Sequence, residues 1–263
     1  MHRMAKYRVR GGYCALVAMA ALAVFCLCSC ASDESLIHIQ GSSATITKPM
    51  LDHWMKAIAA LDYLTYLHTP APEGLVSEPA DYERCAKAAR RVIPRTSTGK
   101  LKLSDAQIAR RCRGLHQAIK SEALALLLAV QWMEIEAKEQ GITVSKRELR
   151  KELQNYSQAA YGAKANWPRA LRERHITTAD TMYLAKRLVL YKQLREKFRA
   201  KVAKAGGGEG AFARIATANY QHMIKRTTCA RGYVIQGCKG YREPGSSAPP
   251  AWVILEGLAK GGG

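Results

Sequence analysis

The feature that most restricts the fold is segment 123–133, in which nearly every side chain is apolar. It lies within the longest expected helix, which begins at Ser104 with Asp105 and continues to Gln140, where Gly141 can end a helix in the left-handed conformation. A helix that is apolar all round has to be buried on every side. A segment of this length is too short to cross a bilayer, which takes about 20 apolar residues. The sequence therefore predicts that this helix forms the centre of the core.

Other segments repeat apolar residues at helical spacing, and several begin with capping residues. Ser145 and Glu148 form a capping box, and Thr177 with Asp180 opens another helix. We expect helices over about 47–67, 81–92, 104–140, 146–160, 166–175, 177–204 and 212–228. The expected fold class is all-α: a bundle of long helices with a short N-terminal β-like segment over 36–39 and a small disulfide-closed C-terminal hairpin over 227–241.

The N-terminus has the pattern of an export signal. Basic residues at positions 3, 6, 8 and 10 precede an apolar run over 13–27, and Leu27-Cys28-Ser29-Cys30 follows. This ending resembles a bacterial lipobox, in which a small residue precedes the cysteine that is acylated and becomes the mature N-terminus. A plain cleaved signal and a retained anchor are the alternatives, although the run is short for a span. We expect lipidation at Cys30 and a location outside the cytoplasm, on the outer face of the cell membrane.

These observations divide the chain into five parts. They are a signal peptide over 1–29, an acylated tether with a short strand over 30–46, a helical domain over 47–204, a Gly-rich joint with a returning helix and a Cys hairpin over 205–241, and a disordered tail over 242–263.

Cysteine usage agrees with export, because an even number of cysteines follows Cys30. An exported protein with Cys85, Cys112, Cys229 and Cys238 is expected to form two disulfides. Sequence alone allows three pairings, of which we favour the local one, Cys85–Cys112 with Cys229–Cys238. Cys112 and His116 lie one helical turn apart and suggest a metal site, but no second pair has ligand spacing, so we expect no metal and no other cofactor.

The formal net charge of +20 indicates which classes of molecule the protein can bind. Outside the membrane a basic protein meets anionic lipid headgroups and anionic wall polymers, so we expect no nucleic-acid partner. The sequence carries no RNA-binding or helix-turn-helix signature either. It also lacks a Ser-His-Asp context, a Gly-rich phosphate loop and a paired-carboxylate pocket, so we assign no catalytic residue.

The order of these pieces resembles a known family. The stretches 46–51 (ITKPML), 136–145 (EAKEQGITVS) and 177–180 (TTAD) occur in the order found in the N-terminal domain of extracytoplasmic foldases of the SurA and PrsA type. The resemblance covers about residues 36–204. It implies a helical scaffold that binds unfolded polypeptides, and in this family a parvulin prolyl-isomerase domain usually follows the long helices.

That catalytic domain has no counterpart in the part of the sequence where the resemblance would place it. Too few residues follow Lys204 to form one, and no parvulin histidine and aromatic pattern can be placed among them. We interpret 205–210 as the joint from which the insert is missing. The resemblance thus implies a membrane-anchored holdase for exported proteins without isomerase activity. The alternative is a basic adaptor that binds anionic envelope polymers or lipids.

Aromatic residues and methionines on the helices are the candidates for contacts with an unfolded polypeptide, since such surfaces adapt to varied partners. Each of them also suits a position in the core. The candidate peptide-binding residues are Trp54, Tyr63, Trp132, Met133, Trp167, Met182 and Tyr183.

The N-terminal pattern generates the first prediction. Mass spectrometry of the purified protein should show that the mature chain begins at Cys30 and that this residue is acylated, because Ser29 is small enough for the cleavage site. Replacing Ser29 with a large residue should block processing. An unmodified Cys30, or a different N-terminus, would contradict the lipoprotein interpretation.

Overall fold

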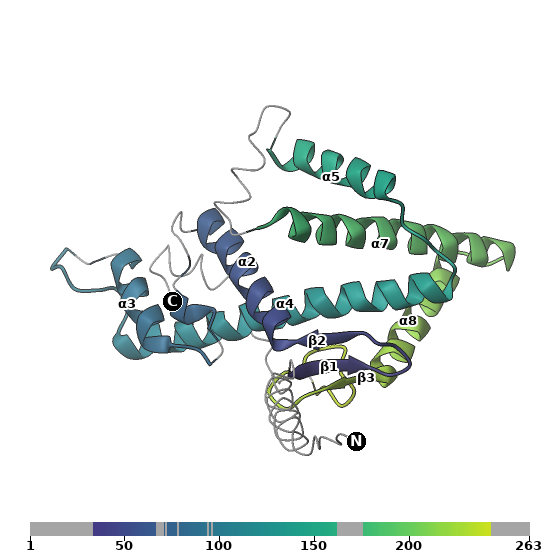
Figure 1. Ribbon diagram of the computed structural model, residues 1–263. Helices are drawn as coiled ribbons and strands as arrows, with labels where there is room; N and C mark the ends of the chain where they lie inside the picture. The colour runs from purple at the N-terminus through teal and green to yellow at the C-terminus, as the bar shows by residue number, and fades with distance from the viewer. Residues whose placement is uncertain are drawn as a thin grey trace, which may run out of the picture. The chain divides into compact units, whose positions relative to one another are not determined.

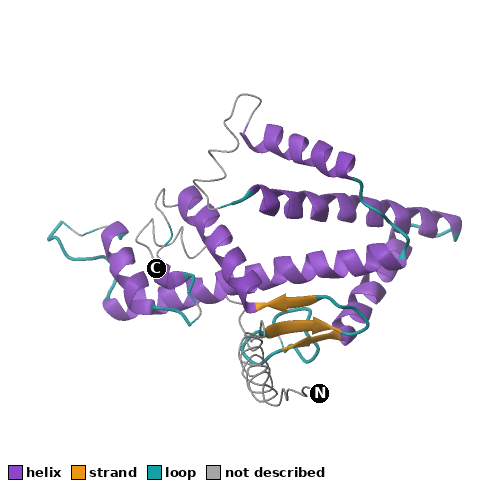
Figure 2. Cartoon of the chain, viewed as in Figure 1, coloured by secondary structure: helices purple, strands orange, loops and turns teal. Residues whose placement is uncertain are grey.

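The computed structural model describes residues 34–66, 71, 73–77, 79–93, 95, 97–161 and 176–242. The signal peptide with Cys30, the small helix expected over 166–175 and nearly all of the tail lie outside the described residues. The described part is mostly helical and has a small three-stranded sheet (Figure 2). Its helices are α2 (Lys48–Tyr66), α3 (Tyr82–Val92), α4 (Asp105–Glu139), α5 (Lys146–Tyr161), α7 (Thr178–Lys204) and α8 (Glu209–Arg226), with a 3-10 turn η1 (Glu73–Leu75).

The long helix α4 is the element on which the others assemble (Figure 1). It begins at a capping box between Ser104 and Gln107, and Gly141 follows it with a φ of 65°. Helices α2, α3 and α7 all pack against it. Within the apolar segment, Ala123, Leu124, Leu127, Leu128 and Val130 are buried, which confirms that this segment lies in the core.

The sheet has the order β2-β1-β3 and joins the two ends of the described chain. Strand β1 (Ser35–Ile39) pairs antiparallel with β2 (Thr45–Thr47) on one side and with β3 (Thr227–Cys229) on the other. The strands are antiparallel, and Leu36, Ile37 and Ile39 of β1 are buried. The backbone groups along both sides of β1 thus find partners, as buried backbone groups require.

The sheet corrects two expectations from the sequence. An all-α fold is too narrow a description, because three strands form. The segment after α8 is also not a self-contained hairpin: β3 pairs with β1 from the other end of the chain, and residues 230–242 fold into turns rather than a return strand. By pairing with β1, strand β3 supplies hydrogen-bond partners to the edge of β1 that the β1–β2 pair alone would leave open.

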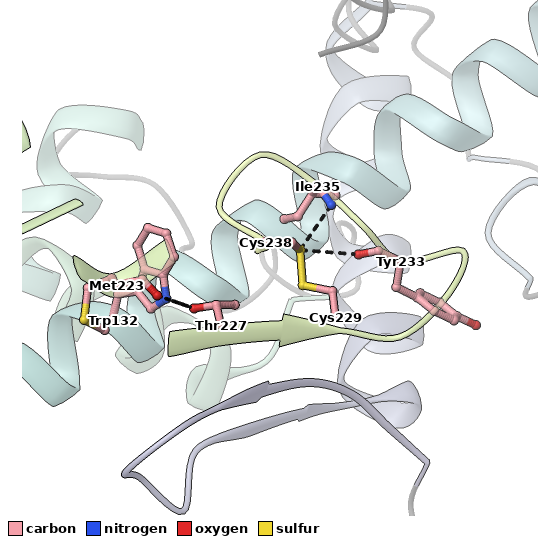
Figure 3. The surroundings of a disulfide bond; sticks show 7 residues. All are labelled: Trp132, Met223, Thr227, Cys229, Tyr233, Ile235 and Cys238. Atoms are coloured by element: carbon pink, nitrogen blue, oxygen red, sulfur yellow. Dashed lines mark hydrogen bonds between the residues drawn. A yellow bond between two sulfur atoms is a disulfide. The ribbon is translucent and has the colours of Figure 1, made fainter. Parts of the chain in front are cut away.

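The cysteines pair in the sequence-local way. Cys85–Cys112 joins α3 to the first half of α4, with a Cα–Cα distance of 6.0 Å. Cys229–Cys238 closes the turns that follow β3, with a Cα–Cα distance of 5.8 Å (Figure 3). Cys112 is therefore bonded to another cysteine, and the His116 ring instead hydrogen-bonds through Nδ1 to the carbonyl oxygen of Leu75 at 2.8 Å.

The Gly-rich joint is a short hydrogen-bonded turn between α7 and α8. The N–H of Gly206 donates to the Ala203 carbonyl, the N–H of Gly207 donates to that of Val202, and the φ of Gly206 is 66°. Helix α8 begins at Glu209, earlier than the expected 212. A side chain at Gly207 would come within 2.7 Å of the Ala211 Cβ, so the helices approach closely at this turn.

The disulfide-closed turns pack directly on α4. Gly237 has a φ of 108°, and a Cβ there would lie 2.9 Å from Leu128 Cδ2 and 3.0 Å from Trp132 Cη2. Only glycine meets both constraints, because a side chain disfavours this φ and no space remains for one. The backbone of the turn thus forms part of the cover over α4.

This contact predicts a difference between two glycines of the same turns. Gly237→Ala should lower the free energy of unfolding by about 2–4 kcal/mol, since overpacking adds to the left-handed strain. Gly232→Ala is the matched control, because Gly232 has a φ of 86° but nothing within 4 Å of its would-be Cβ. Urea unfolding followed by circular dichroism measures both. Equal losses would mean that the contact with Trp132 does not restrict this site.

Candidate functional site

A pocket of about 790 Å³ opens between α4, α7 and α8. Its α4 wall consists of Ala129, Trp132, Met133 and Glu136, its α7 wall of Arg187, Leu188, Tyr191, Leu194, Arg195 and Phe198, and its α8 wall of Phe212, Ala216, Asn219, Tyr220 and Met223. We call this pocket the groove. Its size falls in the range of ligand sites, and its lining is mainly apolar and aromatic.

The position of Trp132 in the groove is fixed from behind. Its Nε1–H donates to the Thr227 hydroxyl at 3.0 Å, and that hydroxyl donates to the Met223 carbonyl at 2.8 Å (Figure 3). Thr227 is fully buried, so its hydroxyl needs both partners. Gly237 packs against the far edge of the indole. A buried tryptophan N–H normally finds an acceptor, and here that acceptor also orients the ring.

The other two walls bring aromatic side chains to the rim. Tyr220 of α8 meets Trp132 edge to face, with 5.5 Å between ring centroids. On α7, Leu194 is buried, whereas Tyr191 is 54% exposed. Tyr220 is 37% exposed. These tyrosines place apolar ring surface in solvent beside the apolar floor, an arrangement typical of binding surfaces.

The α4 wall forms the floor of the groove, and it contains a single carboxylate, that of Glu136. Glu136 is only 6% exposed, and its Oε1 accepts a hydrogen bond from Gln140 Nε2 at 2.9 Å. A buried carboxylate needs hydrogen-bond donors around it and repels a second negative charge. Glu136 therefore disfavours an acidic group of a ligand next to it on the floor.

Two of the predicted peptide-binding residues, Trp132 and Met133, line the groove. Trp54 and Tyr183 do not: they pack together at the junction of α2 and α7, with 5.3 Å between ring centroids, and Trp54 belongs to the core. Met182 is half-buried on α7 outside the groove lining. The side chain of Tyr63 and all of Trp167 lie outside the described residues.

Sequence reasoning missed most of the groove. Tyr191, Phe198, Phe212 and Tyr220 were not among the candidates, although each lies on a segment expected to be helical. Tyr191 lies four positions from an arginine on either side but also three positions from Leu188 and from Leu194, so its spacing does not distinguish core from surface.

The start of α7 is held by a second polar cluster. Asp180 Oδ2 accepts hydrogen bonds from the backbone N–H of Thr177 at 2.7 Å and from its hydroxyl at 2.8 Å. His53 Nε2 of α2 lies 2.6 Å from Asp180 Oδ1. Burial raises the pKa of Asp180, but the hydrogen bonds from Thr177 and His53 outweigh it, so this pKa lies below its ordinary value.

The described residues show no arrangement for metal binding or membrane crossing. Within them, no three His, Cys, Asp or Glu side chains gather in a way that could hold a metal ion. Similarly, none of the described helices is both long enough and apolar enough to traverse a bilayer. The groove lining supplies apolar side chains, aromatic rings and the charged groups of Glu136, Arg187 and Arg195.

The lowered pKa of Asp180 predicts a pH dependence. The ionised carboxylate stabilises the folded state above the unfolded pKa near 4, and this contribution is lost as the pH falls through the lower folded pKa. Asp180→Asn should therefore be less stable than the native chain at pH 6 by about 1 kcal/mol, a difference that shrinks toward pH 3.

Urea unfolding at pH 6 and pH 3 measures this difference. Asp105→Asn is the matched control, because Asp105 is also an acid in a first helical turn but its side chain is 78% exposed. A difference between Asp180→Asn and the native chain that stays constant with pH would contradict the assigned role of the carboxylate.

Comparisons with known proteins give no match: no protein-family model, no curated protein and no solved structure is similar to this chain. The groove is thus interpreted from its own residues.

Proposed function

We propose that the protein is an extracytoplasmic, lipid-anchored holdase that binds apolar segments of unfolded exported polypeptides in the groove. The observation that carries this proposal is an open apolar groove with exposed aromatic residues at its rim. Large exposed apolar surfaces on a folded protein mark interaction sites. The likeness of 36–204 to foldases of the SurA and PrsA type supports the same function and remains a proposal.

The composition of the groove suits varied partners. Met133 and Met223 supply flexible side chains, while Trp132 and Tyr220 supply large rings. Binding would rest on apolar burial, worth about 25 cal/mol per Å² removed from water, from which the ordering of the client is subtracted. We therefore expect weak affinity and broad tolerance of sequence, as a holdase requires.

Filling the groove should abolish holding. Ala216→Trp places an indole in the groove from α8, whereas Ala213→Trp, the matched control, adds the same side chain at an exposed position of α8 outside the lining. Both positions are exposed, so both variants should fold. The chain from residue 30 onward, with Cys30→Ser to prevent acylation, is added to an aggregating model protein while light scattering is recorded.

The native chain and the Ala213→Trp variant should suppress aggregation at both low and high salt, and the Ala216→Trp variant should not. No turnover is expected in a parallel proline-peptide isomerisation assay. Isomerase activity would contradict the assignment as a holdase without catalysis, and equal suppression by the two tryptophan variants would show that clients bind elsewhere.

The second candidate is an adaptor for anionic wall polymers or lipids. The C-terminal half of α7 favours it, because Arg195, Lys197, Arg199, Lys201 and Lys204 are all exposed there. Cations in the last turns also complement the helix dipole, which explains part of the pattern without a partner. Absence of holding, together with polymer binding that salt removes, would favour the adaptor.

A further inference from the structure

One edge of the groove carries an unusual row of side chains. Arg187, Tyr191 and Arg195 follow one another at intervals of four residues, so they lie on successive turns of one face of α7. All three are exposed, and all three line the groove. The two arginines are separated by about 12 Å along the helix axis, since each residue adds 1.5 Å.

These two arginines differ from the lysines beside them on α7. Lys186 pairs with Glu134 at 2.8 Å, and Lys192 pairs with Glu152 at 2.7 Å. Arg187 and Arg195 have no ion pair with any described residue, and no acidic side chain of α8 lines the opposite wall. Within the described part of the chain, Glu134 and Glu152 thus pair with lysines outside the groove, and neither of them pairs with Arg187 or Arg195.

The remaining walls limit where an anionic group can lie. The α8 wall contains Phe212, Ala216, Asn219, Tyr220 and Met223, none of which is charged. On the floor, Glu136 repels a carboxylate. A ligand with both apolar and acidic groups can therefore bind in one orientation, in which its apolar side chains contact the floor and its acidic groups lie along the α7 edge.

We propose that the groove selects polypeptide segments in which apolar residues are flanked by acidic ones, with Arg187 and Arg195 as the specificity-determining residues. This inference rests on the proposed function and names its class of client. A guanidinium presents paired donors that match a carboxylate, which a lysine in the same place does not. Tyr191 between the two arginines covers the apolar part of the segment.

The spacing of the arginines fits an unfolded client. An extended segment advances about 3.3 Å per residue, so acidic residues four positions apart span about 13 Å, close to the rise of about 12 Å between Arg187 and Arg195. Side chains alternate along an extended segment, so the middle one of the three residues between them lies on the side of Tyr191 and the other two point toward the apolar lining. A segment with this pattern can therefore contact both arginines and the apolar floor at the same time.

A fluorescein-labelled peptide of sequence Gly-Glu-Leu-Phe-Leu-Glu-Gly tests the proposal, with a Gln version and a Lys version for comparison. Fluorescence polarisation with the Cys30→Ser chain from residue 30 onward gives each dissociation constant. The Glu peptide should bind about fivefold more tightly than the Gln peptide, as two exposed ion pairs provide. The Lys peptide should bind most weakly.

Two double variants locate the preference. Arg187→Gln with Arg195→Gln should abolish the difference in affinity between the Glu and Gln peptides. Lys201→Gln with Lys225→Gln removes the same charge from exposed positions outside the groove and should keep the fivefold preference. Circular dichroism melts check that both variants fold. Loss of the preference in both variants would assign it to net charge and overturn the proposal.

The remaining outcomes separate this inference from the proposed function. Suppressed aggregation with equal binding of the three peptides would overturn the acidic selectivity and leave the holdase standing. Failure of both holding and peptide binding would overturn both. Phosphatidylglycerol vesicles provide a last test. If they displace the Glu peptide from the native chain but not from the arginine variant, the two arginines bind lipid headgroups, and the proposed class of polypeptide client is overturned.

Discussion

The need to bury the apolar central turns of α4 is the constraint on which the rest of the structure depends. A helix whose central turns are apolar on every side cannot rest against a single neighbour, so several elements have to cover it. Helices α2, α3 and α7 each take part of this surface, and the disulfide-closed turns add backbone at Gly237. The cover is incomplete at Trp132 and Met133, which stay half-buried. The groove lies where this cover ends.

Local signals predicted the helices well because each such signal lies within a few residues. Ser104, Ser145 and Thr177 cap the helices that they were expected to cap, and the local pairing of Cys85 with Cys112 agrees with the structure. Strand β3 was misjudged, because its partner β1 lies at the other end of the chain and only tertiary packing brings the two together. Propensity for a strand is visible in sequence, but the identity of the partner strand is not.

The sequence predicted only part of the candidate site, for a related reason. Trp54 and Trp132 are the same residue type on amphipathic helices, and no local pattern distinguishes them. Trp54 is covered because Tyr183 of α7 packs on it, whereas Trp132 meets Tyr220 at the edge of an open groove. Which aromatic residue is core and which is surface depends on where a later helix lies: α7 covers Trp54, whereas α8, which the short turn at Gly206 and Gly207 connects to α7, only borders Trp132.

The walls of the groove differ in how firmly they are held, and this difference bears on recognition. The Trp132 ring is fixed by the hydroxyl of Thr227, at the start of β3, and by Gly237, which lies in the turns that Cys229–Cys238 closes. A fixed apolar wall lowers the ordering cost of binding for any client, so it favours affinity without selectivity. Arg187, Tyr191 and Arg195 are exposed on the opposite wall and can adjust to a bound segment. We therefore propose that any discrimination between clients comes from the α7 edge, where charge rather than shape differs from one segment to another.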